Sequence, residues 1–399
     1  MAERPWLTIL GLGEDGPDGL TPASLAVLEA AEIVMGPPRH LSLLSGFCGE
    51  TVEWPVPFSD GIEALLSFRG QQVVALASGD PFWFGAGSVL SRHLRPDEWT
   101  ALPGPSCFSL AANRLGWPLE STHFLGLHAA PFARLRPHLN DGQKLIVTLR
   151  DGAATGPLAA YLVDAGFGDS TLHVLQALGG PREEVKTILA DEVLSTSEFS
   201  HPVCVAIDVH GNGAAMPKSS GREDTWFDHD GQITKQPIRA LTLSALAPRY
   251  GEHLWDIGGG SGSIAIEWLL SDPSVQATCI ETVPERAARI MQNAARLGQD
   301  RLRVVTGRAP DALHCLDKPD VVFVGGGLSA ELLTYLSKHV PGTRIVANAV
   351  TLEAEALLSD AQQRYGGELM RIEIANAAPL GAKRGWRAAY PIMQWSGTI

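Results

Sequence analysis

A glycine-rich stretch late in the chain, from Asp256 to Gly262, constrains the fold more than any other feature of the sequence. It reads Asp-Ile-Gly-Gly-Gly-Ser-Gly and follows a short strand-like run at 253–255. Apolar residues at helical spacing begin behind it, at Ile264. Glycine lets the backbone turn tightly and approach a ligand where a Cβ would block it. The order of strand, glycine turn and helix therefore predicts a nucleoside-cofactor site in an α/β sheet.

The spacing of these glycines bears on which cofactor is bound. Dinucleotide sites prefer G-x-G-x-x-G, with a pyrophosphate over the helix N-terminus, whereas this stretch reads D-x-G-x-G-x-G. The leading acid, Asp256, would repel a pyrophosphate and suits the cationic amino-acid end of S-adenosylmethionine (SAM). Glu281 ends the next expected strand, where an acid can grip the two hydroxyls of a ribose. SAM is favoured, and NAD and a plain tight turn remain the alternatives.

Length and composition limit the class of protein. A chain of 399 residues is too long for one ordinary core, so two domains are expected. Its five cysteines are scattered without CxxC pairs, which favours a reducing, cytoplasmic compartment and no metal site. There is no uninterrupted apolar run of membrane-spanning length and no signal-peptide pattern at the N-terminus. A net charge of −13 argues against a nucleic-acid partner and favours a small substrate.

Two α/β blocks are expected, at 1–210 and 229–399, with a linker at 211–228 that is rich in Gly, Ser and Pro near its start. In the first block, strands are predicted at 6–10, 73–77, 145–149, 172–175 and 203–207, and helices from Thr21 and at 88–94, 107–115 and 157–165. In the second block, strands are predicted at 253–257, 276–280, 303–305, 321–324, 344–347, 369–374 and 390–394. One helix is predicted to begin at Pro237, and a second follows the glycine turn and ends at Leu270. Three more are predicted at 284–297, 330–339 and 352–363. This alternation predicts a doubly wound sheet that ends in a hairpin.

The second block resembles a known family from about Ile233 to Trp395. The segments that carry the resemblance are Thr-Lys-Gln-Pro-Ile-Arg from Thr234, the glycine stretch, Gly-Arg-Ala-Pro at 307–310, Phe-Val-Gly-Gly at 323–326 and Asn-Ala-Val-Thr-Leu-Glu at 348–353. Together they resemble the precorrin decarboxylase/methyltransferase family of corrin biosynthesis, although Pro237 stands where that family often has Glu. The resemblance implies that SAM is held by the following residues: Thr234, Gly258, Gly259, Gly260, Ser261, Gly262, Glu281 and the backbone of Ala309.

The first block resembles a second family. Gly-Leu-Gly-Glu-Asp-Gly at 11–16 is a poor dinucleotide site by itself, since no helix opens on its last glycine. With Ser-Gly-Asp-Pro at 78–81 and Pro-Gly-Pro-Ser at 103–106 it resembles the tetrapyrrole methylase family. The resemblance implies a SAM site in a cleft between two α/β halves, contacted by Gly79, Asp80 and Ser106.

Two positions depart from the tetrapyrrole methylase pattern. Glu14 stands where that family usually has Pro, and His-Ala-Ala at 128–130 stands where its members often have H-G-R. If the missing arginine grips a substrate carboxylate, another basic group must replace it, or the activity of this block is altered. Arg39 is one candidate, and a solvated surface arginine is the alternative interpretation.

The two resemblances together imply a tetrapyrrole methylase fold of two α/β subdomains, followed by a Rossmann-like SAM methyltransferase fold, with one SAM site in each. They imply methylation of C5 by the first block, and methylation of C15 with loss of the C12 acetate carboxyl by the second, on a reduced precorrin-6. The implied product is precorrin-8X, and the implied assembly is a homo-oligomer. Whether the precorrin carries cobalt stays open. The other hypotheses are a protein or RNA methyltransferase and a SAM-binding protein with a degenerate first half.

A precorrin carries many carboxylates, so cations are expected in its pocket although the protein is acidic. The densest basic run is Ala-Lys-Arg-Gly-Trp-Arg at 382–387, which is expected in the loop before the last strand. Lys383, Arg384 and Arg387 are therefore candidate carboxylate clamps, with Trp386 as a stacking surface. An exposed basic hairpin loop is the alternative. No catalytic side chain is singled out, because positioning is expected to be the main contribution of the protein.

Overall fold

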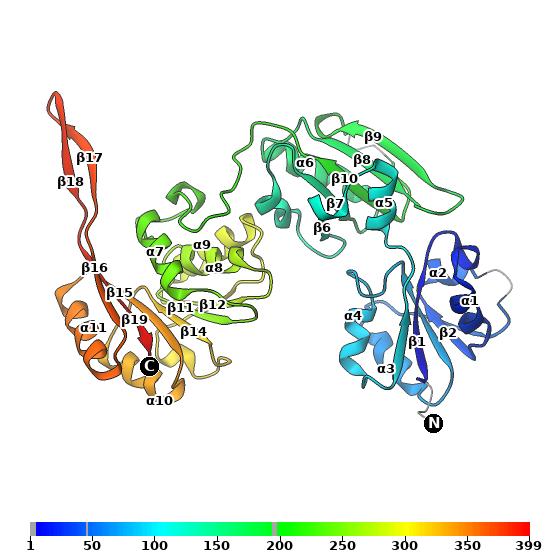
Figure 1. The fold of residues 1–399 in the computed structure, drawn as a ribbon, viewed down its shortest axis with the longest axis horizontal. Helices are drawn as coiled ribbons and strands as arrows, with labels where there is room; N and C mark the ends of the chain where they lie inside the picture. The colour runs from blue at the N-terminus through cyan, green and yellow to red at the C-terminus, as the bar shows by residue number, and fades with distance from the viewer. Residues whose placement is uncertain (1–4, 45–46, 194–197) are drawn as a thin grey trace. The chain divides into compact units, whose positions relative to one another are not determined.

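The computed structural model describes residues 5–44, 47–193 and 198–399, and it divides into two compact units (Figure 1). The first unit comprises Met1–Phe132 and His138–Ala214, and the second comprises Ala133–Pro137 and Ala215–Ile399. The division after Ala214 falls inside the segment expected to be a linker. Further along that segment, the backbone N–H groups of Gly221 and Arg222 donate to the carboxylate of Glu267 at 2.7 and 3.0 Å. The later part of the segment is therefore packed onto the second unit.

The first unit begins with a sheet of five parallel strands in the order β3-β2-β4-β1-β5. The strands are β1 (Leu7–Leu12), β2 (Ile33–Gly36), β3 (Glu50–Glu53), β4 (Val73–Ser78) and β5 (Trp99–Leu102). The helices between them are α1 (Pro22–Glu29), α2 (Pro38–Ser42), α3 (Asp60–Ser67) and α4 (Gly87–Leu90). Helix α1 begins where the sequence predicted it, because the Thr21 hydroxyl accepts a hydrogen bond from the Ser24 N–H at 3.2 Å.

A second five-stranded sheet completes the first unit, in the order β6-β7-β10-β8-β9. Its strands are β6 (Thr122–Gly126), β7 (Lys144–Thr148), β8 (Thr171–Gln176), β9 (Glu184–Leu189) and β10 (Val203–Asp208). Only the β6–β7 pair is parallel among these ladders. Helices α5 (Cys107–Leu115) and α6 (Thr155–Asp164) belong to this half. The two sheets confirm the two α/β halves that the tetrapyrrole methylase resemblance implied.

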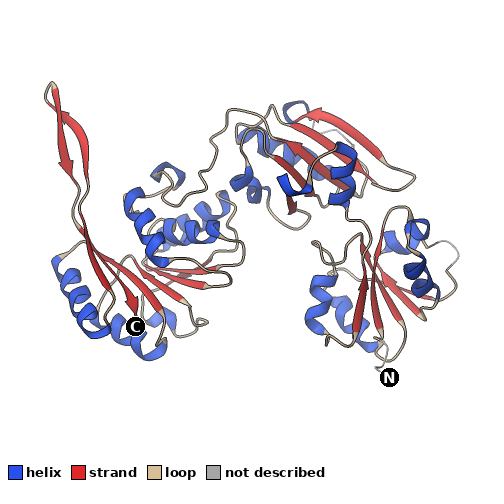
Figure 2. Cartoon of the chain, in the orientation of Figure 1, coloured by secondary structure: helices blue, strands red, loops and turns tan. Residues whose placement is uncertain are grey.

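The second unit is built on a seven-stranded sheet in the order β13-β12-β11-β14-β15-β19-β16. Its strands are β11 (His253–Ile257), β12 (Gln276–Glu281), β13 (Arg303–Thr306), β14 (Val321–Val324), β15 (Arg344–Ala349), β16 (Glu368–Ile372) and β19 (Ile392–Thr398). Its helices are α7 (Gln236–Leu246), α8 (Ser263–Ser271), α9 (Pro284–Arg296), α10 (Ala330–His339) and α11 (Leu352–Tyr365). The first three helices share one apolar core and the last two share another, so the sheet is covered on both faces (Figure 2). The predicted doubly wound sheet is confirmed.

The basic run at 382–387 is not in a loop, and this prediction was wrong. Lys383–Ala388 forms strand β18, which pairs along its whole length with β17 (Ala375–Leu380) as a separate two-stranded arm. Figure 1 shows the arm extending from the ends of β16 and β19. Nearly all its residues are exposed on both faces. The arm lacks the alternation of apolar and polar residues that marks a half-buried strand, and the sequence therefore gave no strand signal.

The strands that the sequence analysis missed in the first unit share a position in the sheets. Four of the five, β3, β5, β6 and β9, are edge strands. Strand β9 has no buried residue, and β3 has only one that is even partly buried. Because an edge strand is covered less completely than a central one, its sequence carries no continuous apolar run. In the described part of the chain, no helix is long and apolar enough to cross a membrane.

Candidate functional site

The glycine stretch lies at the point where the strand order of the second unit reverses. Strand β12 lies on one side of β11 and β14 lies on the other, so the connections leave in opposite directions. Ligands of doubly wound sheets bind outside the carboxyl ends of the strands at such a point. The turn 258–262 follows β11, Glu281 ends β12, the segment 307–309 follows β13, and the glycines 325–327 follow β14. The topology therefore gathers the predicted residues at one edge.

Gly258 brings two of these turns into backbone contact. Its φ is +78°, and a Cβ added there would lie 2.6 Å from the backbone nitrogen of Gly326. Gly260 has a φ of +58°, and a Cβ there would lie 3.0 Å from the Gln232 carbonyl oxygen, in the segment that leads into α7. Side chains at these positions would meet backbone atoms that cannot move aside. The turn therefore needs glycine at both positions, and a ligand can approach its backbone closely.

Glu281 joins the glycine turn to its neighbours. Its carboxylate is 4% exposed and accepts hydrogen bonds from the Gly260 N–H at 2.8 Å and the Val283 N–H at 2.9 Å. Its carbonyl oxygen accepts from the Gly307 N–H at 2.9 Å, which holds the Ala309 segment beside it. The Thr282 hydroxyl also donates to Oε1 at 3.2 Å. Since a carboxylate has about four acceptor positions, these bonds leave one position on Oε2 for a ribose hydroxyl. The placement of Glu281 fits the nucleoside role that the sequence predicted.

Asp256, the acid ahead of the glycines, faces inward. It is 1% exposed, and its Oδ2 accepts a hydrogen bond from the Ala265 N–H at 3.1 Å. Burial raises the pKa of this carboxyl to about 7, and the nearby Glu281 charge acts in the same direction. Asp256 therefore secures the first turn of α8 and is not exposed to a ligand. Its burial and raised pKa do not favour the predicted role of its charge toward a cationic ligand.

The remaining predicted residues of this site offer backbone more than side chains. A Cβ at Gly259 would lie 2.1 Å from the Cys279 sulfur, and one at Gly262 would lie 2.7 Å from Ile290. Ser261 is buried, and its hydroxyl lacks a hydrogen-bond partner within the described structure. A cofactor would therefore meet the peptide groups of this turn.

Thr234 is positioned by an arginine that the sequence analysis did not single out. The Thr234 carbonyl accepts a hydrogen bond from Arg239, which is fully buried. Arg239 also pairs with Glu267 at 2.7 Å and with Asp224 at 3.2 Å. A buried arginine needs such partners because an unpaired charge in the interior is very costly. The Arg239 network therefore holds the Thr234 segment in place; the family motif contained this arginine, but nothing in the sequence showed that it is buried.

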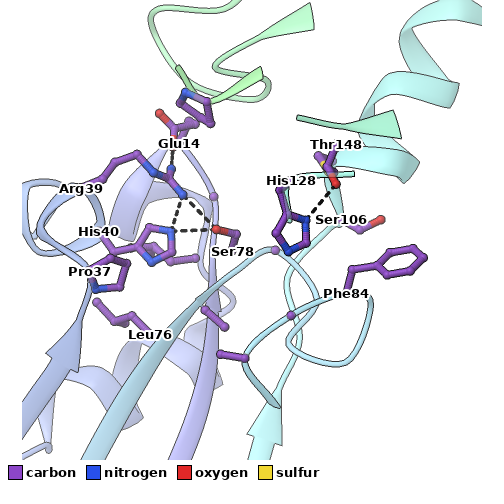
Figure 3. A pocket seen from close by; sticks show the side chains of 18 of the residues that line it. Glu14, Pro37, Arg39, His40, Leu76, Ser78, Phe84, Ser106, His128 and Thr148 are labelled. Carbon is purple, nitrogen blue, oxygen red and sulfur yellow. Dashed lines mark hydrogen bonds and ion pairs between the residues drawn. The ribbon is translucent and has the colours of Figure 1, made fainter. Parts of the chain in front are cut away.

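The first unit contains a cavity of about 610 Å³ that residues of both its sheets line. Gly79, Ser106 and Arg39, three of the predicted residues, line it (Figure 3). Gly79 has a φ of +54°, and a Cβ there would lie 2.6 Å from the Pro105 carbonyl oxygen. Ser106 caps α5 by accepting from the Ser109 N–H at 3.1 Å. The two motifs of the tetrapyrrole methylase resemblance therefore meet in one wall of the cavity.

Asp80 does not belong to the lining of this cavity. Its Oδ1 accepts a hydrogen bond from the Phe82 N–H at 2.8 Å, so it shapes its own loop. Five aromatic residues that were not predicted from the sequence line the cavity: Trp54, Phe58, Trp83, Phe84 and Phe108. They come from three stretches of the chain, at 54–58, 83–84 and 108, which are far apart in the sequence. Trp54 and Phe108 are buried, whereas Phe58, Trp83 and Phe84 are exposed and suit contact with a large planar ligand.

A charged cluster occupies one side of the cavity (Figure 3). Arg39 forms an ion pair with Glu14 and donates from Nη2 to His40 Nε2 at 2.8 Å and to Ser78 Oγ at 2.9 Å. Its side chain is 25% exposed, so it is not the solvated surface arginine of the alternative interpretation. Glu14, a departure from the family pattern, is 7% exposed and also pairs with Arg182 at 3.0 Å. Glu14 therefore fills its position as a buried anchor for two arginines.

His40 is held in its neutral form. Burial lowers its pKa to about 3, and the Arg39 charge acts in the same direction. Because an arginine only donates, His40 Nε2 must accept and the ring proton resides on Nδ1. His40 therefore orients Arg39 and adds no charge of its own.

The residues at 128–130, the second departure from the tetrapyrrole methylase pattern, also border a cavity. Ala129 and Ala130 line a hollow of about 470 Å³, together with His128 and Arg150. The Arg150 guanidinium pairs with Asp151 at 2.8 Å.

The predicted carboxylate clamps lie on β18 in the arm and not at the carboxyl ends of the parallel strands; they are Lys383, Arg384 and Arg387. Trp386, on the same strand, is 79% exposed.

Comparison with known proteins places both units. Residues 7–194 match the tetrapyrrole (corrin/porphyrin) methylases, and residues 225–399 match the precorrin methyltransferase domain. The folds and the matches define a methyltransferase that joins a tetrapyrrole methylase unit to a Rossmann-like unit. A precorrin-6Y C(5,15)-methyltransferase (decarboxylating) from Sinorhizobium sp is 48% identical over 99% of this chain and 96% of its own length. The chain belongs to the precorrin-6Y C5,15-methyltransferase (decarboxylating) family.

Two shorter relatives each match part of the chain. A cobalt-precorrin-6B C(15)-methyltransferase (decarboxylating) from Salmonella typhimurium is 30% identical over 40% of this chain and 85% of its own length. A cobalt-precorrin-7 C(5)-methyltransferase from the same organism is 26% identical over 49% of this chain and 96% of its own length. Use of SAM follows from membership of the methyltransferase family.

Proposed function

We propose that this chain methylates C5 and C15 of precorrin-6Y and removes the carboxyl group of its C12 acetate, giving precorrin-8X. The proposal assigns one SAM site to each unit, with C5 methylation in the first unit and C15 methylation and decarboxylation in the second. The observation that carries it is the presence of two differently built sites in one chain, the glycine turn at Gly258 and the cavity at Gly79. The name of the 48% identical relative supports the metal-free substrate.

In the second unit, the proposed SAM site rests on peptide groups and one carboxylate. Gly258 and Gly260 leave space that a Cβ would fill, and Oε2 of Glu281 has a free acceptor position for a ribose hydroxyl. The Ala309 backbone stands beside Glu281, where an adenine edge can meet it. The glycines 325–327 keep the region over the turn free of bulky side chains, which suits a large planar substrate. Thr234, Gly259, Ser261 and Gly262 complete this proposed site.

In the first unit, we assign SAM to the wall formed by Gly79 and Ser106 and the macrocycle to the aromatic lining. Asp80 acts there by holding the loop that follows Gly79. When bound, SAM supplies an electrophilic methyl group. An electron-rich meso carbon needs little help from a base, so the contribution of the residues is to orient the two reactants and exclude water. Decarboxylation needs an electron sink, which the protonated macrocycle itself provides.

The test measures sites and products separately. Calorimetry of the full chain with SAM should give two sites, and incubation with precorrin-6Y and SAM should add two methyl groups and remove one CO2 by mass spectrometry. Gly79→Ala should abolish the C5 methyl alone, since its Cβ would meet backbone. Glu281→Gln should reduce the C15 methyl and CO2 release while C5 methylation persists. A single SAM site, or variants that reduce both methylations equally, would refute the assignment.

A further inference from the structure

Glu14 gathers two guanidinium groups at the side of the first-unit cavity. Its Oε1 pairs with Arg39 and its Oε2 pairs with Arg182 at 3.0 Å, while its own side chain is only 6% exposed. One carboxylate between two arginines leaves a net charge of +1. The three residues come from the loop after β1, from α2, and from the connection between β8 and β9.

The two arginines differ in what they can still bind. Arg39 uses Nη1 for Glu14 and both hydrogens of Nη2 for His40 and Ser78, so most of its fork is committed. Arg182 reaches Glu14 through Nη2, and its side chain is 60% exposed. The outer N–H groups of its guanidinium therefore face solvent and can donate two hydrogen bonds to a carboxylate, the geometry that guanidinium favours.

Arg182 is held at the rim of the cavity by close packing of its loop. A Cβ at Gly180 would lie 2.6 Å from the Glu14 Cβ, so the loop rests directly on Glu14, which lines the cavity. His201 also lines the cavity, and its pKa is lowered by burial and by the charges of Arg39 and Arg182. The charge of Arg182 therefore acts on a residue of the cavity lining, although the Arg182 side chain is not itself part of that lining.

We propose that Arg182, anchored by Glu14 beside Arg39, binds a carboxylate side chain of the tetrapyrrole substrate and so orients the macrocycle for the first unit. This proposal rests on the proposed function, because it requires the macrocycle to enter this cavity. It provides a basic group in the unit where His-Ala-Ala at 128–130 stands in place of the H-G-R that the family resemblance implies. Glu14 is a positioning residue in this arrangement, and Arg182 is the group that touches the substrate.

The test compares Arg182→Gln with Arg182→Lys and with Arg95→Gln in the full chain. Arg95 is another exposed arginine of the same unit, paired with Asp97 and absent from the cavity lining. Arg182→Gln should raise the KM for precorrin-6Y in C5 methylation about tenfold, as expected for losing a charge-assisted pair, with kcat and the Kd for SAM unchanged. Arg182→Lys should give a smaller increase, because it keeps the charge and loses the fork.

The KM of the Arg182→Gln variant, compared with that of Arg95→Gln, decides whether Arg182 binds the substrate. An Arg182→Gln variant with the KM of Arg95→Gln would overturn it, and so would a loss of SAM affinity or of melting temperature that accounts for the whole defect. The lysine variant provides the same comparison if the glutamine variant does not fold. C15 methylation of the same samples should stay at the wild-type rate. If the wild-type chain itself shows no C5 methylation, the proposed function has failed, and this result is distinct from an unchanged KM.

Discussion

The two proposed SAM sites are built in different ways. The site in the second unit consists largely of peptide groups from one contiguous turn at the reversal point of a parallel sheet. The site in the first unit is a cavity that joins the Gly79 wall to a charged side formed by Glu14 and Arg39. Arg182, distant from both in the sequence, pairs with Glu14 from outside the lining. A site made of backbone depends on where glycine is allowed, whereas a site made of side chains depends on which charges the fold brings together. Substitutions should therefore impair the two sites in different ways.

The largest expected effect is that of Gly258→Ala. Its Cβ would lie 2.6 Å from the backbone of Gly326, and its φ of +78° is already unfavourable for alanine. We expect SAM binding in the second unit to weaken more than a hundredfold, because the whole turn must shift. Gly342→Ala is the matched control, since its φ is +80° and nothing lies within 4 Å of its added Cβ. It should cost about 1–2 kcal/mol of stability and no SAM affinity. Calorimetry and urea unfolding would measure both, and equal effects would contradict the backbone-built site.

Asp256→Asn should change how the stability of the second unit depends on pH. A carboxyl whose pKa rises from 3.8 to about 7 on folding binds protons more tightly in the folded state. Its contribution is complete below pH 3.8 and is lost as the pH rises to about 7. The wild-type unit should therefore lose stability across this range, and Asp256→Asn should lose less. Hydrogen exchange of β11 and α8 would report it, with Asp360→Asn, an exposed acid on α11, as the control. Parallel pH profiles for the three proteins would rule the effect out.

His40→Gln should act in the opposite direction, in the first unit. The pKa of His40 falls from 6.5 to about 3 on folding, so its contribution is present above pH 6.5 and is lost as the pH falls toward 3. A glutamine that keeps an acceptor for Arg39 should make this unit less sensitive to acid. Hydrogen exchange of β1 and β4 between pH 7 and 4 would measure the change, with the exposed His93→Gln as the control. If acid destabilised the His40 variant as much as the wild type, the neutral-histidine account would be wrong.

The smallest effect is expected for the double variant Arg384→Gln and Arg387→Gln in the arm. If these residues clamp substrate carboxylates, the KM for precorrin-6Y in C15 methylation should rise severalfold while the Kd for SAM stays the same. Both are exposed on β18, and exposed ion pairs are worth little, about 0–1 kcal/mol each. Steady-state kinetics of each methylation would measure the change. Unchanged kinetics would exclude Arg384 and Arg387 from substrate binding in C15 methylation.

The elements that the sequence predicted well carry strong local signals. Helices α5 and α10 begin and end at the predicted residues, and each has a serine whose hydroxyl caps its first turn. The central strands β4, β7 and β10 appear as apolar runs because they are buried, and in β8 the apolar residues flank His173. The four edge strands of the first unit and the arm were missed, because their pairing is decided by backbone groups of distant segments and leaves little trace in side-chain hydropathy.

The sequence by itself determined the α/β alternation of the second unit's main sheet, the glycine turn, Glu281 and the two family resemblances, because each of these depends on residues that are close together in the chain. Only the tertiary structure decided that Asp256 faces inward, that Arg239 anchors the Thr234 segment, and that Glu14 holds Arg39 and Arg182 together. Burial and charge pairing depend on segments far apart in sequence, and a residue's identity does not state what the fold will place beside it. The turn could therefore be predicted from its own residues, whereas the charged cluster of the first unit could be recognised only in the folded chain.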